Sequence, residues 1–174
     1  MELSGKKVMV MVAEMYNDYE FIYPYYRLLE TGADVQVVGA KSGVVYSGKA
    51  GTTAKSTAAA EDLSPADFAG VVIPGGYAPD FMRRSAAMVD LVRELDKQGK
   101  VVAAICHAGW MLASAKILQG RTVTSFFAIK DDLIHAGANW VDQEVVEDGK
   151  LITSRTPEDL PAFMRAVIRA MSQV

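Results

Sequence analysis

The 174-residue sequence contains only one cysteine and two histidines. A single cysteine cannot form an intrachain disulfide, so Cys106 is expected to be a free thiol, which favours a reducing compartment. The histidines show no metal-ligand spacing, and His135 is typical of the last turn of a helix. We therefore expect neither a metal centre nor another cofactor.

The sequence also lacks an excess of positive charge and any long apolar run. Its net charge is −3, with a pI near 5.4, which argues against nucleic acid as the main partner. No stretch approaches the length of a membrane span. Residues 1–7 do not begin a signal-peptide pattern, because the apolar run that follows them is too short. The expectation is a cytoplasmic protein with no membrane partner.

What the sequence does contain is a regular alternation of buried-strand and helix patterns. The strands are expected at 7–13, 34–38, 70–74, 101–105, 121–125, 140–146 and 150–154. Helices are expected from Asp18 to 31, and at 86–98, 110–115, 129–135 and 157–171, the last with Thr156 as its cap. Pro24 implies a kink or a late start of the first helix. Residues 42–55 are expected to form an irregular hairpin, and residues 61–65 a loop. The pattern predicts one α/β domain over 1–174, a three-layer sandwich with a mostly parallel sheet and helices on both faces.

The most informative stretch is 101–110, an apolar β-branched run that meets a helix pattern at Cys106. A nucleophile at a sharp strand-to-helix turn is pushed out of the sheet edge and is surrounded by free backbone N–H groups. The alternative is a buried, inert cysteine, which is what a lone cysteine by itself favours. The small residues around the turn and the adjacent His107 favour the reactive thiol.

Three loops leave the carboxyl ends of predicted strands, and in an open α/β sheet ligands bind at these ends. They carry Glu20, the Gly75-Gly76 pair and Cys106. Glu20 is the carboxyl group expected nearest the thiol, and we predict a shared proton, with Glu20 titrating high and Cys106 low. The alternative role for Glu20 is a solvated residue of the first helical turn.

The glycine pair and His107 also have two interpretations. Gly75 and Gly76 let a backbone N–H approach a ligand closely, or form an ordinary Pro-Gly turn. His107 is a candidate general base, oriented by a carboxylate such as Asp80, or a polar residue that faces water at a helix start.

Several segments together resemble the PfpI family of the ThiJ/PfpI superfamily. They are 104–107 (AICH), 72–80 (VIPGGYAPD), Glu20 four residues before Pro24, 130–132 (KDD), 137–142 (GANWVD) and 154–160 (SRTPEDL). The resemblance covers essentially the whole chain and implies the flavodoxin-like sandwich of class I glutamine amidotransferases.

The resemblance also implies roles for individual residues. Cys106 would be the reactive thiol at a strained elbow, hydrogen-bonded to Glu20. The backbone of Gly76 and His107 would form an oxyanion pocket, and Asp80 of a neighbouring subunit would complete a Cys-His-acid triad. A homodimer or higher homo-oligomer is therefore expected.

Three residues depart from the family pattern. Asp80 stands where peptidase-like members carry Glu, and the shorter reach to His107 argues against peptidase activity, because a small displacement can reduce a positioned reaction ~100-fold. Ala108 replaces a usual Gly and narrows the floor of the pocket that Gly75 is expected to line. Tyr77, also expected in this lining, replaces a frequent Arg and removes an anchor for an anionic substrate.

The same thiol serves three functions that the resemblance allows. The first is a stress-response hydrolase or lyase, glyoxalase- or deglycase-like, in which Cys106 attacks a small carbonyl or glycated substrate. The second is an intracellular cysteine peptidase with an intersubunit Cys106–His107–Asp80 triad and a peptide substrate. The third is a redox sensor or chaperone in which Cys106 is oxidised.

Overall fold

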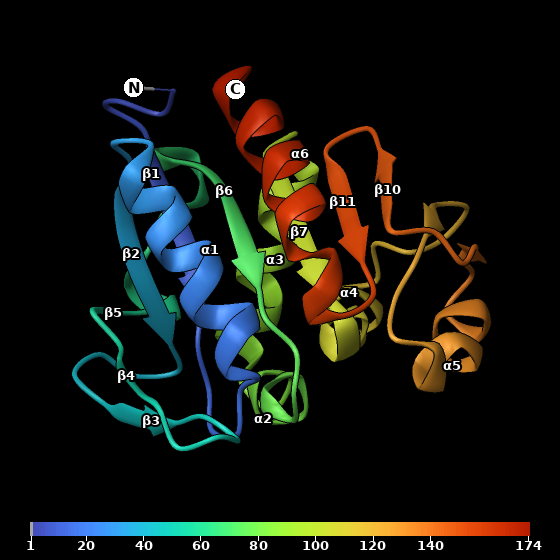
Figure 1. Ribbon diagram of the computed structural model, residues 1–174, viewed down its shortest axis with the longest axis horizontal. Helices are drawn as coiled ribbons and strands as arrows, with labels where there is room; N and C mark the ends of the chain where they lie inside the picture. Colours follow the sequence, from blue (N-terminus) through green and yellow to red (C-terminus); the bar gives the residue numbers. More distant parts are fainter. Residues whose placement is uncertain (1) are drawn as a thin grey trace.

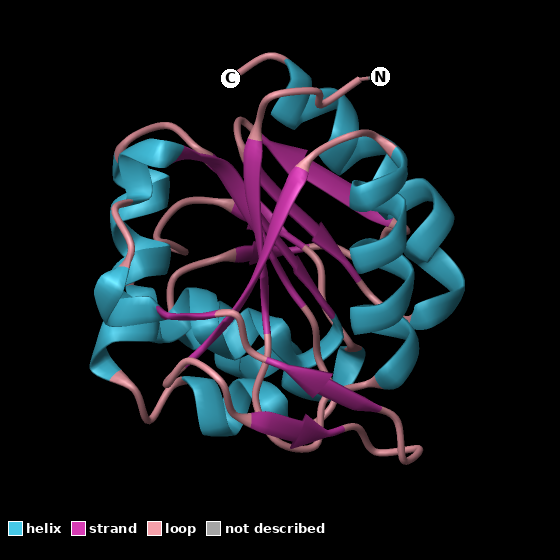
Figure 2. Cartoon of the chain, turned by 90° about the vertical axis from the view of Figure 1, so that its left-hand side faces the viewer, coloured by secondary structure: helices cyan, strands magenta, loops and turns pink. Residues whose placement is uncertain are grey.

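The computed structural model describes residues 2–174, which form a twisted central sheet between two layers of helices (Figures 1 and 2). The sheet has seven strands in the order β10-β11-β7-β6-β1-β2-β5. Their bounds are β1 (Lys7–Met11), β2 (Asp34–Gly39), β5 (Ala58–Ala59), β6 (Phe68–Ile73), β7 (Val101–Ile105), β10 (Val145–Asp148) and β11 (Leu151–Ser154). All neighbouring pairs in it are parallel except β10 with β11.

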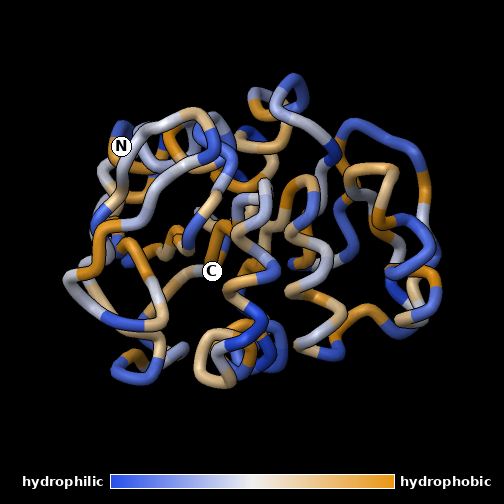
Figure 3. The backbone as a smooth tube through the Cα atoms, turned by 90° about the horizontal axis from the view of Figure 1, so that it is seen from below, coloured by the Kyte–Doolittle hydropathy of each residue, from blue (hydrophilic) through white to orange (hydrophobic). Residues whose placement is uncertain are grey.

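The helices are α1 (Asp18–Glu30), α2 (Ala78–Met82), α3 (Ala86–Lys97), α4 (Gly109–Ala115), α5 (Lys130–His135) and α6 (Leu160–Ser172). Helices α1 and α6 pack together on one face of the sheet, and α3 and α4 cover the other (Figure 1). Hydrophobic and hydrophilic stretches alternate along the backbone (Figure 3). Helices α3 and α6, for example, each bury one apolar stripe against the sheet. The predicted three-layer α/β fold with a mostly parallel sheet is confirmed.

The central strands are apolar along their whole length because both of their faces are covered. Every residue of β6 and of β7 is buried. Their carboxyl ends lie at the lower edge of the sheet in Figure 1, where α2 and the hairpin of β3 (Val45–Ser47) and β4 (Thr53–Lys55) also lie. The irregular hairpin predicted over 42–55 is confirmed.

Helix α1 begins where the sequence places it, although its cap is Asn17, whose side chain accepts from the N–H groups of Tyr19 and Glu20. The predicted late start at Pro24 is wrong: the helix runs through this proline. Pro24 has no N–H, so the carbonyl of Glu20 loses its helical donor.

The strand expected at 140–146 is not a single element. Residues Asn139–Trp140 form β9, which pairs with β8 (Thr122–Val123) in a separate two-stranded sheet, and β10 begins only at Val145. The chain has to leave one partner strand for another, so an unbroken strand is impossible here. The strand expected at 121–125 is likewise only two residues long.

The last helix also differs from its prediction at its start. Residues Pro157–Asp159 form a 3₁₀ turn, and α6 follows at Leu160. Pro161 lacks the N–H that would bond to the carbonyl of residue 157, so an α-helix beginning at 157 would lose this hydrogen bond in its first turn. The side chain of Thr156 makes no capping hydrogen bond to this turn, contrary to the prediction.

Candidate active site

Cys106 lies at a sharp turn between β7 and α4. Its φ is +62°, a left-handed conformation that is rare for residues other than glycine. The turn continues as a 3₁₀ segment, Cys106–Ala108, and the Cys106 carbonyl accepts a hydrogen bond from the N–H of Phe126 at 3.2 Å. A non-glycine residue held in this conformation is typical of functional sites, and it turns the side chain out of the strand direction.

The sulfur is close to several polar groups, although Cys106 is only 8% exposed. Nδ1 of His107 lies 3.2 Å from Sγ, so the His107 ring reaches the thiol within its own chain. Burial raises the pKa of the thiol, and the backbone N–H groups of His107 and Gly76 lower it. These two amides are the predicted oxyanion donors, and the structure places both beside the sulfur.

The two glycines are required by the close packing at this point. A methyl group on Gly75 would lie 2.6 Å from Oε2 of Glu20, 2.8 Å from Cβ of Cys106 and 3.0 Å from N of His107. Gly76 has φ +73°, and a methyl group there would lie 2.5 Å from the backbone nitrogen of Asn17. The glycine pair therefore brings the acid, the thiol and an amide donor together.

Glu20 is fully buried, and its Oε2 accepts a hydrogen bond of 2.7 Å from the N–H of Gly75. Its Oε1 is buried and has no hydrogen-bond partner. Burial raises the pKa of Glu20 to about 7, although the Gly75 amide and the Cys106 thiol lower it. A carboxyl oxygen without a donor is costly when ionised, which agrees with this raised pKa. The alternative of a solvated Glu20 is wrong, and the prediction that it titrates high is confirmed.

The prediction that Cys106 titrates low is wrong. Burial raises the pKa of Cys106 to about 12, the Glu20 charge adds to this effect, and the two backbone amides only partly offset it. Because the two groups are in contact, their titrations belong to the pair. When the pair carries one negative charge, these directions place its remaining proton on the sulfur rather than on the carboxylate.

The His107 ring is half-buried between aromatic side chains. It stacks on Phe126 with ring centroids 5.0 Å apart and meets the edge of Trp110 at 5.2 Å. Burial, followed by the charge of Lys49, lowers the pKa of His107. The imidazole is therefore neutral at pH 7 and can accept a proton.

Asp80 does not complete this constellation within the chain. It lies in the short helix α2, and its carboxylate pairs with Arg84; among the described residues no hydrogen bond joins it to His107. The prediction assigns Asp80 to a neighbouring subunit's site, and it remains a prediction.

The remaining predicted lining residues differ in exposure. Tyr77 is 54% exposed and directly follows Gly76. Ala108 is fully buried in the core, and its place in the pocket lining remains a prediction.

Two features near the thiol have no signal in the local sequence. Lys49, in the turn between β3 and β4, acts on both titrating groups, and the Phe126 ring supports His107. Both belong to segments that only the tertiary fold brings to this edge. In residues 2–174 no three His, Cys, Asp or Glu side chains are grouped so as to hold a metal ion.

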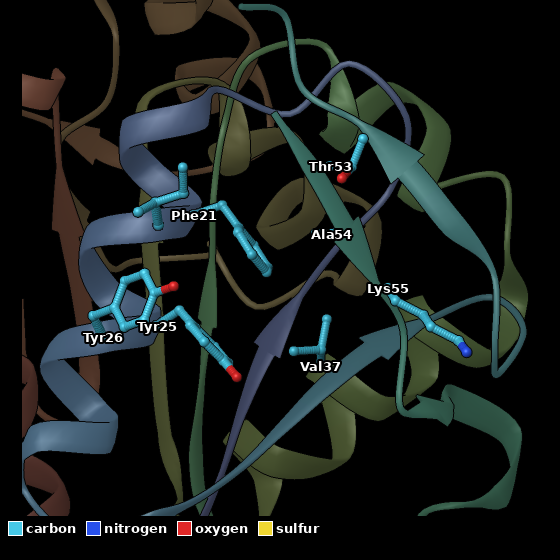
Figure 4. Close-up of a pocket in the computed structure, with 8 residues that line it drawn as sticks. Phe21, Tyr25, Tyr26, Val37, Thr53, Ala54 and Lys55 are labelled. Carbon is cyan, nitrogen blue, oxygen red and sulfur yellow. The ribbon is translucent and has the colours of Figure 1, made fainter. Parts of the chain in front are cut away.

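A separate hollow lies between α1, β2 and β4 (Figure 4). It is lined by Phe21, Ile22, Tyr25, Tyr26, Val37, Thr53, Ala54 and Lys55. None of the predicted catalytic residues belongs to this lining, which is mostly apolar and aromatic. The convergent polar groups of a reaction centre are around Cys106 instead.

The sequence is similar to known proteins over most of its length. The profile of the DJ-1/PfpI family matches residues 6–170. A protein named a deglycase in Pyrococcus abyssi is 43% identical over 165 residues, which cover 95% of this chain and 99% of that protein. Deglycase PfpI of Pyrococcus furiosus is 40% identical with the same coverage. A Bacillus subtilis protein, whose name gives cysteine protease as a provisional assignment, is 36% identical over 161 residues, covering 92% and 95%.

Solved structures give the same fold. A two-domain protein of Anabaena variabilis, with DJ-1/ThiJ/PfpI-like and ferritin-like domains, superposes with a TM-score of 0.93 at 40% identity. The match covers 94% of this chain and 47% of that one, so this chain spans about half of it. Drosophila melanogaster DJ-1beta superposes with a TM-score of 0.90 at 29% identity. This match covers 99% of this chain and 92% of DJ-1beta. Of the helices in residues 2–174, none is long and apolar enough to cross a membrane.

Proposed function

Because this chain belongs to the DJ-1/PfpI family, we propose that it is a deglycase- or glyoxalase-like enzyme in which Cys106 attacks a small carbonyl or glycated substrate. The observation that supports this proposal is a buried thiol held at a left-handed turn beside the fully buried Glu20 carboxyl and His107. The Glu20 charge raises the thiol pKa, and the backbone N–H groups of His107 and Gly76 lower it. Relatives named as deglycases support the proposal. The free thiol further favours the cytoplasm as its location.

In the first step the Cys106 proton moves to Glu20 while Sγ forms a bond to the carbonyl carbon. The carbonyl π electrons move to its oxygen, which accepts hydrogen bonds from the N–H groups of Gly76 and His107. Glu20 is suited to this transfer because its pKa of about 7 lies near the working pH.

With a 2-oxoaldehyde the thiohemiacetal needs no external oxidant. Neutral His107 removes the proton from the former aldehyde carbon and returns it to the neighbouring carbonyl carbon. The oxygen of that second carbon takes the proton that Glu20 received from Cys106. The product is a thioester of a 2-hydroxy acid. Water then hydrolyses the thioester, which releases the acid and restores the thiol.

The test is turnover of methylglyoxal and of a glycated thiol by the wild type, Cys106→Ser and Cys106→Ala. We expect both variants to fall to the uncatalysed rate, with circular dichroism showing that each is folded. Turnover that survives in both folded variants would contradict the proposal. Oxidation of Cys106 in a wild type that turns over neither substrate would favour the redox-sensor function.

A peptidase with an intersubunit triad is the second candidate, and the Bacillus subtilis relative whose name gives cysteine protease as a provisional assignment favours it. Within the chain the Asp80 carboxylate pairs with Arg84 and leaves His107 without an acid. Asp80→Asn should then abolish cleavage of short fluorogenic peptides. Asp90→Asn is the matched control, because Asp90 forms a similar exposed helical pair with Arg93. Equal cleavage by the two variants would exclude the triad.

A further inference from the structure

Three extended segments, around Gly48, Tyr16 and Gly76, lie side by side at the carboxyl edge of the sheet. The segment with Tyr16 is in the middle. The backbone of Tyr16 bridges Gly48 in parallel and Gly76 antiparallel. Its carbonyl accepts a hydrogen bond of 2.9 Å from the N–H of Lys49. The turn between β3 and β4 is therefore one strand away from Gly76, whose amide contacts the Cys106 thiol.

A buried carboxylate holds this turn in place. Asp18 is 6% exposed, and it accepts hydrogen bonds from the N–H of Ala50 at 2.7 Å, the N–H of Thr52 at 3.0 Å and Oγ1 of Thr52 at 2.5 Å. A methyl group on Gly48 would lie 2.4 Å from Oδ1 of Asp18. Charge-assisted hydrogen bonds of this kind are strong, so they stabilise the turn directly after Lys49.

From this turn the Lys49 side chain extends to the rim of the site. Its Nζ lies over the ring of Tyr77, 5.0 Å from the centroid, and Tyr77 directly follows Gly76. The ion pairs formed among residues 2–174 do not include Lys49. Burial is the main cause of the pKa shifts of Glu20 and His107, but the Lys49 charge lowers both pKa values, which places its field at the reacting groups.

We propose that Lys49 is a specificity-determining residue that favours carbonyl substrates carrying an anionic group, a carboxylate or a phosphate, close to the carbon that Cys106 attacks. A lysine ammonium is a point charge without a required approach direction, and here it has no acid to neutralise. The Tyr77 ring holds it at the rim by a cation–π contact. The substrate class rests on the proposed function, whereas the charge preference of the site does not.

The charge preference can be measured without turnover, because Cys106 is the only thiol in the chain. Iodoacetate and iodoacetamide alkylate the same sulfur and differ in charge. We expect Lys49→Gln to lower the ratio of the iodoacetate rate constant to the iodoacetamide rate constant about fivefold, which is the effect of one exposed charge pair. Raising the salt from about 0.02 M to about 0.5 M should reduce this difference, and Lys49→Arg should retain it. Lys55→Gln is the matched control, since Lys55 is an exposed lysine of the same hairpin.

The second measurement uses 2-oxoaldehydes only. It compares kcat/KM for 4,5-dioxopentanoate with that for 2-oxopentanal, and for the phosphate ester of 3-hydroxy-2-oxopropanal with that for the unphosphorylated compound. Lys49→Gln should lower both ratios if the charge alone matters, and one of them if carboxylate and phosphate are distinguished. Unchanged alkylation ratios in Lys49→Gln would overturn the inference. If Cys106-dependent turnover is found but Lys49→Gln leaves the alkylation and kcat/KM ratios unchanged, the proposed function stands and the role of Lys49 is wrong. If Lys49→Gln alters the alkylation ratio but no substrate is turned over, only the proposed function is contradicted.

Discussion

The buried carboxyl of Glu20 should make the protein less stable as the pH rises from acid to neutral. Its pKa is about 7 in the folded chain and 4.5 ordinarily. Below pH 4.5 the carboxyl is protonated in both states and has no effect. As the pH rises toward 7, the unfolded chain releases the proton while the folded chain retains it, so the free energy of unfolding falls.

The size of this effect follows from the difference between the two pKa values. The change from 4.5 to about 7 corresponds to about 3 kcal/mol, fully developed above pH 7. Glu20 is 0% exposed, so solvent does not screen this effect. It also does not depend on which atom of the Glu20–Cys106 pair holds the proton, because linkage counts the protons of the pair.

Glu20→Gln removes the titrating group and keeps the size of the side chain. The difference in unfolding free energy, variant minus wild type, should therefore rise by about 3 kcal/mol between pH 4.5 and about pH 8. Urea denaturation followed by the fluorescence of Trp110 and Trp140 measures it at each pH. Repeating the series at a tenfold dilution separates this effect from any dissociation of subunits.

The matched control is Glu61→Gln, which removes an exposed carboxyl and should give a difference that changes little with pH. The raised pKa of Glu20 would be refuted if Glu20→Gln and the wild type both unfold cooperatively and the difference between their unfolding free energies does not change with pH. In that case Glu20 would be ionised throughout the pH range, and it could not serve as the proton acceptor of the thiol.

Two further predictions concern the packing of the site. Gly76→Ala should lower the free energy of unfolding by at least about 2 kcal/mol more than Gly149→Ala, because both glycines have positive φ but only the first is crowded by backbone; equal losses in urea denaturation would contradict this. Phe126→Leu should raise the pKa of His107, because burial is the main cause of its lowered pKa and Phe126 stacks on the ring. An NMR titration measures the change, with His135 as the internal reference, and an unchanged His107 pKa would show that Phe126 does not contribute to that burial.

Sequence alone determined the elements whose signal is local. The apolar run of β7, the change to a helix pattern at Cys106 and the alternation of strands with helices predict the α/β sandwich and the sharp turn at Cys106. The glycine pair at 75–76 was also predicted, because only a residue without Cβ allows such close approach. These features depend on neighbours in the chain, so the order of residues shows them.

The titration of the site was decided by the tertiary structure. Glu20 and Gly75 are separated by 55 positions, and the sequence does not say that their contact leaves the acid fully buried. Burial raised the pKa of Cys106 to about 12, whereas a helix-start cysteine had been expected to titrate low. Desolvation depends on everything packed around a group, and a local pattern does not contain that information.

The same reason explains Lys49 and the broken strand at 140–146. Lys49 reaches the site because Asp18 anchors a turn through residues 32 and 34 positions further along the chain, and β9 ends early because its partner strand does. Side chains and strands that depend on distant partners become visible only once the chain is folded, since their energies come from contacts that no local periodicity records.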